Sequence, residues 1–167
     1  MNLYILRHGI AVERGASDVD KDADRSLTSK GEKELWRITE AMKALNLSFD
    51  HIVSSPYRRA RQTAEIVAEA FKARKKLALL DSLTPDADAK TLIEHLNRLR
   101  PGPESVLLVG HEPYLSDLIS QLVSGGASFP VAMKKGGLCK LATASLKYGR
   151  CATLEWLLTP KQMELMG

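Results

Sequence analysis

The feature that most constrains the fold is a regular alternation of short apolar runs with longer segments of helical periodicity. Buried strands are predicted where a short apolar run ends in polar residues, at 2–6, 50–54, 77–80 and 105–109. Helices are predicted where apolar residues recur at every third or fourth position, at 29–45, 56–74, 89–99 and 113–123. Alternating strands and helices favour an α/β domain, a three-layer α/β/α sandwich with a mostly parallel sheet.

The C-terminal part of the chain departs from this alternation. Strands are predicted at 138–145 and 151–158, joined by a turn at Tyr148-Gly149, so at least one strand of the sheet should run antiparallel. In this hairpin Cys139 and Cys151 would not face each other, and their spacing is not that of a metal site. We therefore expect two reduced thiols rather than a disulfide.

Length and composition exclude several classes of protein. The 167 residues, 44% of them apolar and 26% charged, fit one globular domain over residues 1–167. No apolar run reaches the roughly 18 residues of a membrane helix, and the N-terminal run stops at Arg7, so we expect a cytoplasmic protein with no membrane partner. The net charge is +4, but the basic residues are dispersed and only 5% of residues are aromatic, so we expect no nucleic-acid partner.

The start of the first predicted helix and the loop before it carry polar signals. Ser29 and Glu32 match a capping box, and Thr28 is an equally good N-cap one residue earlier. The loop at 10–26 carries Asp18, Asp20, Asp22 and Asp24. It lacks the glycine and the terminal glutamate of an EF-hand, so we interpret it as a solvated loop and expect no metal there.

Polar clusters follow three of the predicted strands, namely Arg7-His8-Gly9, Ser54-Ser55-Pro56 and Gly110-His111-Glu112. Ligands of open α/β sheets bind beyond the carboxyl ends of the strands, so loops that are far apart in sequence can converge on one crevice there. We therefore expect His8, Arg59 and His111 to lie together.

Such a group would form a cationic pocket for a phosphoryl group. Arginine holds phosphate oxygens by planar, bidentate hydrogen bonds, and helices that begin near Pro56 and Pro113 could add backbone N–H groups. A neutral imidazole can attack phosphorus itself, so no cysteine or serine is needed as the nucleophile. Positive neighbours lower the pKa of His8, which keeps its ring neutral near pH 7, and they stabilise charge on the transferring group.

These motifs together resemble the histidine phosphatase superfamily, the proteins related to phosphoglycerate mutase and acid phosphatase. The resemblance rests on Leu6-Arg7-His8-Gly9, on Ser54-Ser55-Pro56 with residues 59–64, and on Gly110-His111, in this order. The short length, with Leu27-Thr28, Gly31, Leu83-Thr84-Pro85 and Leu158-Thr159-Pro160, is similar to the SixA type of phosphohistidine phosphatase. The resemblance implies a mixed six-stranded sheet between helices and neither a metal nor an organic cofactor.

The resemblance also implies roles for individual residues. His8 would carry the phosphoryl group during turnover, and Arg7 and Arg59 would grip it. His111 would stabilise the transition state, and the carbonyl of Gly9 would accept the second ring N–H of His8 and so fix its tautomer. Further candidates for substrate contact are Arg25, Ser55, Arg58 and Glu112.

One departure from the family bears on the substrate. Phosphoglycerate-mutase-like members carry a glutamate after the third strand that protonates the leaving oxygen, whereas this chain reads Leu80-Asp81-Ser82-Leu83-Thr84-Pro85. Asp81, Asp86 and Asp88 remain as substitutes. An alkoxide needs an acid in order to leave, and an imidazole needs far less help. The missing glutamate therefore favours a P–N substrate such as phosphohistidine.

The expected partner is thus a phosphorylated protein, such as a histidine phosphotransfer-type domain, which the enzyme would dephosphorylate. Other functions stay open. The same core could serve a phosphomonoesterase for small phosphorylated metabolites. A phospho-binding module without catalysis would need only the arginines, so the two imidazoles argue against it, and a basic nucleic-acid binder would show salt-sensitive binding without phosphatase activity.

Overall fold

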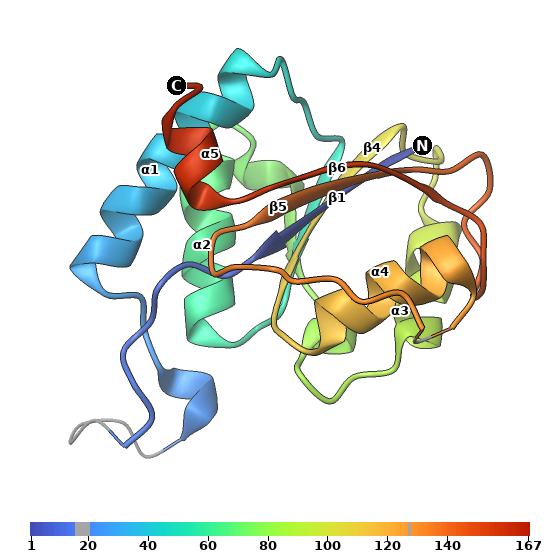
Figure 1. Cartoon of the computed structure of the whole chain (residues 1–167), viewed down its shortest axis with the longest axis horizontal. Helices are drawn as coiled ribbons and strands as arrows, with labels where there is room; N and C mark the ends of the chain where they lie inside the picture. Colours follow the sequence, from blue (N-terminus) through green and yellow to red (C-terminus); the bar gives the residue numbers. More distant parts are fainter. Residues whose placement is uncertain (16–20, 127) are drawn as a thin grey trace.

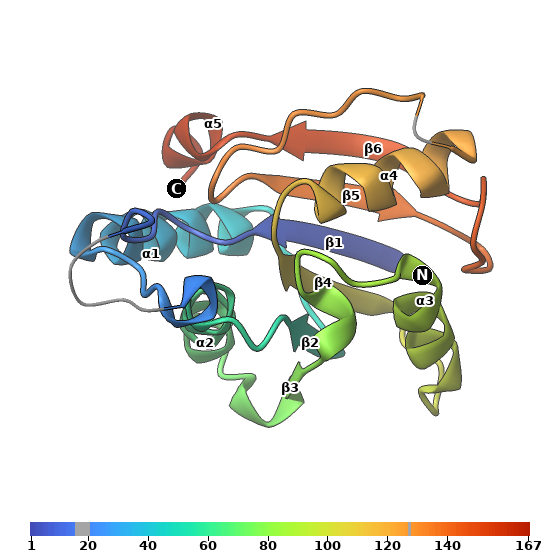
Figure 2. The ribbon, with the colours of Figure 1, turned by 90° about the horizontal axis from the view of Figure 1, so that it is seen from below.

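The computed structural model describes residues 1–15, 21–126 and 128–167, and in these ranges six strands form one sheet. The strands are β1 (Asn2–Arg7), β2 (His51–Ser54), β3 (Leu77–Leu79), β4 (Ser105–Gly110), β5 (Leu138–Ala142) and β6 (Thr153–Leu158). Their order is β3-β2-β4-β1-β5-β6 (Figure 2). β5 runs antiparallel to both of its neighbours, and the pairs among the first four strands are parallel. The predicted mixed, mostly parallel six-stranded sheet is confirmed.

Helices cover both faces of this sheet (Figures 1 and 2). They are α1 (Ser29–Ala44), α2 (Arg58–Ala70), α3 (Ala89–Arg98), α4 (Tyr114–Ser124) and α5 (Pro160–Glu164). Helices α1, α2 and α5 pack with Tyr4 and Leu6 of β1, whereas α3 and α4 pack with Leu3 and Ile5 of the same strand. A central strand that is buried on both faces must be apolar throughout, which explains the continuous run that β1 shows. The three-layer arrangement is thus confirmed, and none of the described helices could cross a membrane.

Helix α1 begins at Ser29, as its predicted range does, and the structure distinguishes its two candidate caps. Thr28, and not Ser29, is the N-cap of α1, because its hydroxyl accepts the N–H of Gly31 at 3.0 Å. A side chain at Gly31 would place its Cβ 2.2 Å from the carbonyl oxygen of Ile10, so this turn and the chain after β1 fit together only with glycine here. Helix α2 is shorter than predicted and leaves Pro56 outside.

The C-terminal hairpin is shorter than predicted, and a last helix follows it. The hydroxyl of Thr143 donates to carbonyl oxygens of the turn, including that of Cys151 at 2.7 Å, and the ladder ends before it. Cys139 pairs with Leu157, so the two cysteines do not face each other, and both are free thiols. Helix α5 was not predicted, although the capping box of Thr159 and Gln162 with Pro160 at its start was a readable signal.

The loop predicted at 10–26 is described in part. Residues 16–20, which include Asp18 and Asp20, lie outside the described residues. After them, Asp22–Asp24 form the short 3-10 helix η1, which lies beside α2 (Figure 2). Ala11 and Leu27 form an antiparallel bridge that closes the base of this loop. Both ends of the loop are therefore attached to the body of the protein, on the side where β1 and β2 end.

Candidate active site

The ends of β1 and β4 place His8 and His111 next to each other. The parallel ladder between the two strands ends with the pair Arg7 and Gly110, and the N–H of His8 donates to the carbonyl of Gly110 at 3.1 Å. The residues that follow the two strands therefore lie side by side at the same edge of the sheet. The two imidazole centroids are 5.1 Å apart, with an angle of 54° between the ring planes. The structure thus brings together the two histidines that the strand ends predicted.

The hydrogen bonds of His8 define its tautomer. Nδ1 lies 2.7 Å from the carbonyl oxygen of Gly9, and a carbonyl only accepts, so Nδ1 carries the hydrogen. Nε2 then keeps its lone pair, and the Nε–H of Arg59 donates to it at 3.2 Å. The contact implied for Gly9 is present. The N–H of Gly9 also donates to the Thr63 hydroxyl at 3.1 Å, which fixes the turn after β1 against α2.

Both imidazoles are neutral at physiological pH. Burial lowers the pKa of His8 to about 3, against the effect of the Gly9 hydrogen bond and with the help of the charges of Arg59 and Arg7. Burial also lowers the pKa of His111 to about 3, again assisted by the charge of Arg59. A neutral ring has a free lone pair, so each imidazole can accept a proton or attack an electrophile.

These two low pKa values predict a pH-dependent stability. In the unfolded chain the histidines take up protons near pH 6.5, and in the folded chain only near pH 3. The unfolded state therefore binds more protons between these limits, and we expect the free energy of unfolding to fall as the pH drops from 6.5, by roughly 1.4 kcal/mol per pH unit for each ring. Urea unfolding at pH 7.0, 6.0 and 5.0 measures this slope.

The variant His8→Asn provides the comparison, because it removes one of the two rings and leaves every carboxyl group in place. We expect its slope between pH 6 and pH 5 to be smaller than that of the wild type by the contribution of one imidazole. Equal slopes in the two proteins would contradict the low pKa of His8.

His111 is held from two sides by residues of the segment after β2. Its Nε2 lies 2.8 Å from the Ser55 hydroxyl, which also accepts the N–H of Tyr57 at 3.3 Å. The ring of Tyr57 packs edge-on against His111 with centroids 5.2 Å apart. The buried Nδ1 of His111 has no partner within the described residues. Sequence reasoning missed Tyr57, although it directly follows the Ser54-Ser55-Pro56 motif.

Arg59 lies in the first turn of α2 and is 3% exposed. Besides donating to His8, it donates from Nη1 to the main-chain oxygen of Asp22 at 2.6 Å and from Nη2 to Oδ2 of Asp22 at 2.9 Å. Oδ1 of Asp22 accepts from Nε of Arg25 at 2.9 Å and from Nε of Arg14 at 3.0 Å. The interpretation of Asp22 as a solvated loop residue is therefore wrong, because its carboxylate joins three guanidinium groups.

The charge of Asp22 is fixed by these neighbours. Burial acts to raise the pKa of Asp22, but the hydrogen bond and the charge of Arg59, together with Arg14 and Arg25, outweigh it and lower the pKa. Asp22 is thus ionised at neutral pH. The predicted substrate residue Arg25 is half-buried here, where it also donates from Nη1 to the carbonyl oxygen of Val12 at 2.9 Å.

Arg7 and Glu112 lie at the ends of β1 and β4. Nη1 of Arg7 donates to the carbonyl oxygen of Met133 at 2.6 Å, and its buried Nε has no partner within the described residues. Burial raises the pKa of Glu112, against its hydrogen bonds from Ser116 and the positive charge of Arg7. The contact to Met133, in the segment between α4 and β5, had no signal in the sequence.

The remaining candidates differ in their surroundings. Arg58 is exposed and lines a hollow of about 470 Å³ together with Tyr57 and Arg61. In the described part of the chain, no hydrogen bond or ion pair joins Asp81, Asp86 or Asp88 to either site histidine; Asp88 instead caps α3. Roles of Arg58, Ser55 and Glu112 in substrate binding stay predictions.

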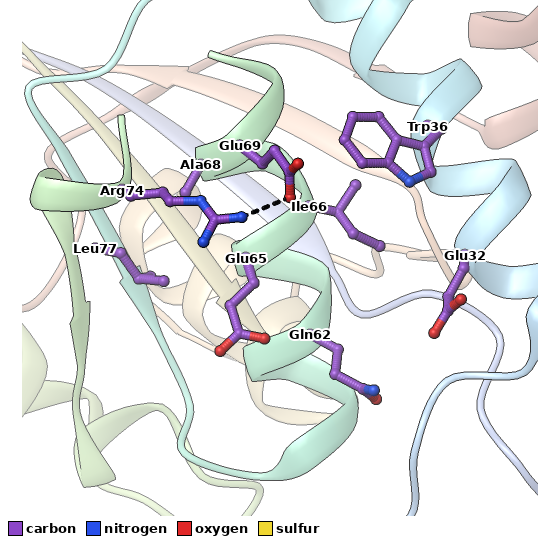
Figure 3. Close-up of a pocket in the computed structure, with 9 residues that line it drawn as sticks. All are labelled: Glu32, Trp36, Gln62, Glu65, Ile66, Ala68, Glu69, Arg74 and Leu77. Atoms are coloured by element: carbon purple, nitrogen blue, oxygen red, sulfur yellow. Dashed lines mark hydrogen bonds and ion pairs between the residues drawn. The ribbon is translucent and has the colours of Figure 1, made fainter. Parts of the chain in front are cut away.

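A separate hollow of about 590 Å³ lies between α1 and α2 (Figure 3). Trp36 and Glu32 line it from α1, and Glu69 lies on α2, where its carboxylate pairs with Arg74 at 2.8 Å. None of the predicted site residues is among those that line it. The described residues also contain no group of three or more His, Cys, Asp or Glu side chains that could hold a metal ion. This hollow is therefore separate from the residues at the strand ends.

The chain resembles known proteins in both sequence and structure. The family model "Histidine phosphatase superfamily (branch 1)" matches residues 3–84. The chain is 32% identical to the phosphohistidine phosphatase SixA homolog of Haemophilus influenzae, over 73% of this chain and 77% of that protein. It is 27% identical to phosphohistidine phosphatase SixA of Escherichia coli, over 99% and 98% of the two chains. The structure of the protein histidine phosphatase SixA complexed with tungstate matches with a TM-score of 0.83 at 27% identity, over 96% and 98% of the two chains. The chain therefore belongs to the histidine phosphatase superfamily, in which it groups with enzymes of the SixA type.

Proposed function

We propose that the enzyme removes the phosphoryl group from phosphohistidine on a partner protein by way of a phosphohistidine intermediate on His8. The observation that supports this proposal is the protonation state of Nε2 of His8. Nε2 of His8 is unprotonated, because Nδ1 holds its hydrogen against the Gly9 carbonyl at 2.7 Å. It also faces the guanidinium of Arg59 at 3.2 Å. A lone pair beside a phosphate-binding group is what a nucleophile for phosphorus requires.

In the first step, Nε2 of His8 forms a bond to phosphorus while the P–N bond of the substrate breaks. The leaving imidazole keeps the electron pair of that bond and takes up a proton. The Nε–H of Arg59 now donates to an oxygen of the phosphoryl group instead of to Nε2 of His8, and Arg7 binds the same group. Meanwhile the Gly9 carbonyl stabilises the positive charge that develops on the ring of His8.

In the second step, water attacks phosphorus and the bond to Nε2 of His8 breaks. Inorganic phosphate leaves, and the lone pair returns to Nε2. The proton that water loses balances the proton that the leaving imidazole gained. His111 lies 5.1 Å from His8 between ring centroids and stays neutral at working pH, so it can receive this proton for a time and stabilise the transition state.

The substrate class follows from what a leaving group needs. General acids contribute about 10²–10⁴-fold to the departure of poor leaving groups. In the described part of the chain no hydrogen bond or ion pair joins Asp81, Asp86 or Asp88 to His8 or His111, and Glu112 accepts the N–H of Ser116 at 3.0 Å. An imidazole needs far less help from such an acid, since its other ring nitrogen can take up a proton from water. The Escherichia coli relative is itself a phosphohistidine phosphatase, which supports the same class here.

A partner such as a histidine phosphotransfer-type domain would bring its phosphorylated imidazole to the strand ends. Around the reacting atoms, Arg25, Ser55, Arg58 and Glu112 are the residues that we propose to contact it. We place the reaction in the cytoplasm, where the two free thiols stay reduced.

The test compares kcat/KM for a phosphohistidine-bearing phosphotransfer domain with that for a panel of small phosphomonoesters. Because no hydrogen bond or ion pair joins Asp81, Asp86 or Asp88 to the site histidines among the described residues, we expect the protein substrate to be favoured by about 100-fold or more. A preference for an ester would identify a phosphomonoesterase instead. Binding of the phosphorylated domain without release of phosphate would identify a phospho-binding module.

A further inference from the structure

We infer that Asp22 is a positioning residue for phosphoryl transfer, which holds one edge of the Arg59 guanidinium so that the other edge faces Nε2 of His8. This inference rests on the proposed function, because it concerns how Arg59 meets the group on His8. Asp22 comes from η1, far from α2 in the chain, and none of the sequence motifs includes it.

The guanidinium of Arg59 can bind two groups at the same time. Four of its five N–H groups form two edges, one of Nη1 with Nη2 and one of Nε with Nη2, and each edge can bind an anion in bidentate fashion. Asp22 takes the first edge with two oxygens, its main-chain carbonyl at 2.6 Å and Oδ2 at 2.9 Å. The second edge is directed at His8, since Nε donates to Nε2 at 3.2 Å. A phosphoryl group on Nε2 would meet this second edge.

Asp22 is itself held in place. Nε of Arg25 donates to Oδ1 of Asp22 at 2.9 Å. Nη1 of Arg25 donates to the carbonyl oxygen of Val12, which lies in the first part of the same loop. The Arg25 side chain is 15% exposed and the Asp22 side chain 31%, so their ion pair is partly buried. The Arg14 side chain is 79% exposed, so its ion pair with Asp22 contributes little. Arg25 is therefore the support for Asp22.

Another interpretation of the same contacts makes the opposite prediction. If the Asp22 carboxylate were an internal competitor for the phosphoryl group, its removal would strengthen anion binding. Two observations favour the positioning role. Asp22 uses its main-chain oxygen as well as its side chain, and it bonds to Nη1 and Nη2 of Arg59, whereas Nε donates to His8.

The experiment measures kcat and KM for Asp22→Ala and Asp22→Asn with a phosphohistidine-bearing domain. Small errors in the position of a catalytic group cost up to about 10²-fold in rate, so we expect Asp22→Ala to lower kcat by about 30-fold or more, with KM changed less than about 3-fold. Asp22→Asn keeps an oxygen for Nη2 and should lose about 10-fold. Asp24→Asn removes the same charge from the same turn and serves as the matched control, with an unchanged kcat.

A double-mutant cycle with Arg59→Ala tests whether Asp22 acts through Arg59. In that background we expect Asp22→Ala to change kcat by less than about 2-fold, because the group that it positions is absent. A purely structural role would lower the melting temperature and act equally in both backgrounds, so circular dichroism and thermal unfolding accompany the kinetics. Asp22→Asn keeps the test available if Asp22→Ala does not fold.

The outcomes separate this inference from the proposed function. An unchanged kcat in Asp22→Ala, tighter binding of inorganic phosphate in that variant, or an equal loss in both backgrounds would overturn the positioning role. If Arg59→Ala itself had wild-type activity, the proposed function would fail instead.

Discussion

Replacement of His8 by asparagine is expected to lower the rate of phosphate release by about 10⁴-fold or more and to abolish covalent labelling of the enzyme. The reason lies in Nε2, which is unprotonated because Nδ1 donates to Gly9. An asparagine amide can donate to the same carbonyl, but it has no lone pair that attacks phosphorus. Single-turnover mixing with a ³²P-phosphohistidine domain, followed by denaturing gel electrophoresis at alkaline pH, measures the label on the chain.

The control for this variant is His95→Asn, which makes the same substitution in helix α3, away from the strand ends. It should label and turn over like the wild type. If His8→Asn formed the labelled intermediate and released phosphate at the wild-type rate, the assignment of the nucleophile would be wrong.

Replacement of Arg59 by lysine is expected to lower kcat by about 10²–10³-fold, nearly as much as replacement by alanine. Lysine keeps the positive charge, but an ammonium group has no planar fork. It cannot donate to Nε2 of His8 and at the same time to two oxygens of Asp22, as Arg59 does. Steady-state kinetics of the two variants with the phosphohistidine domain distinguish the effect of charge from that of geometry.

Arg61→Ala is the matched control, because Arg61 lies on the same helix and pairs with Glu65 at 3.1 Å on the exposed side. We expect its kcat to stay within about 2-fold of the wild type, since exposed ion pairs contribute little. A lysine variant of Arg59 with most of the wild-type activity would mean that charge alone suffices at this position.

Most of the fold could be predicted because the central strands β1, β2 and β4 are short, buried on both faces and separated by amphipathic helices. The first and last residues of helices and strands were less predictable where two local signals compete. Thr28 and Ser29 are equally good caps in sequence, and the choice depends on the approach of Gly31 to the Ile10 carbonyl, which is a tertiary contact. Strand β5 ends early because Thr143 bonds within the turn.

The candidate site could be predicted where its residues follow strands, since the sheet brings strand ends together. His8 and His111 are such residues, and their rings lie 5.1 Å apart. Asp22 could not be predicted, because it lies in an acidic loop that resembles any solvated segment. Its contact with Arg59 depends on how that loop folds back over α2, which no local pattern encodes.

The order of the strands in the sheet also determines at which stage of synthesis and folding the enzyme can become active. β1 is the first strand to be made, yet its two neighbours in the sheet are β4 and β5, both from the second half of the chain. During synthesis β1 has no neighbouring strand to pair with until β4 has left the ribosome. His8, at the end of β1, therefore cannot take part in catalysis before that point. Recovery of turnover after dilution from denaturant would accordingly report the insertion of β4 between β2 and β1, and no earlier collapse.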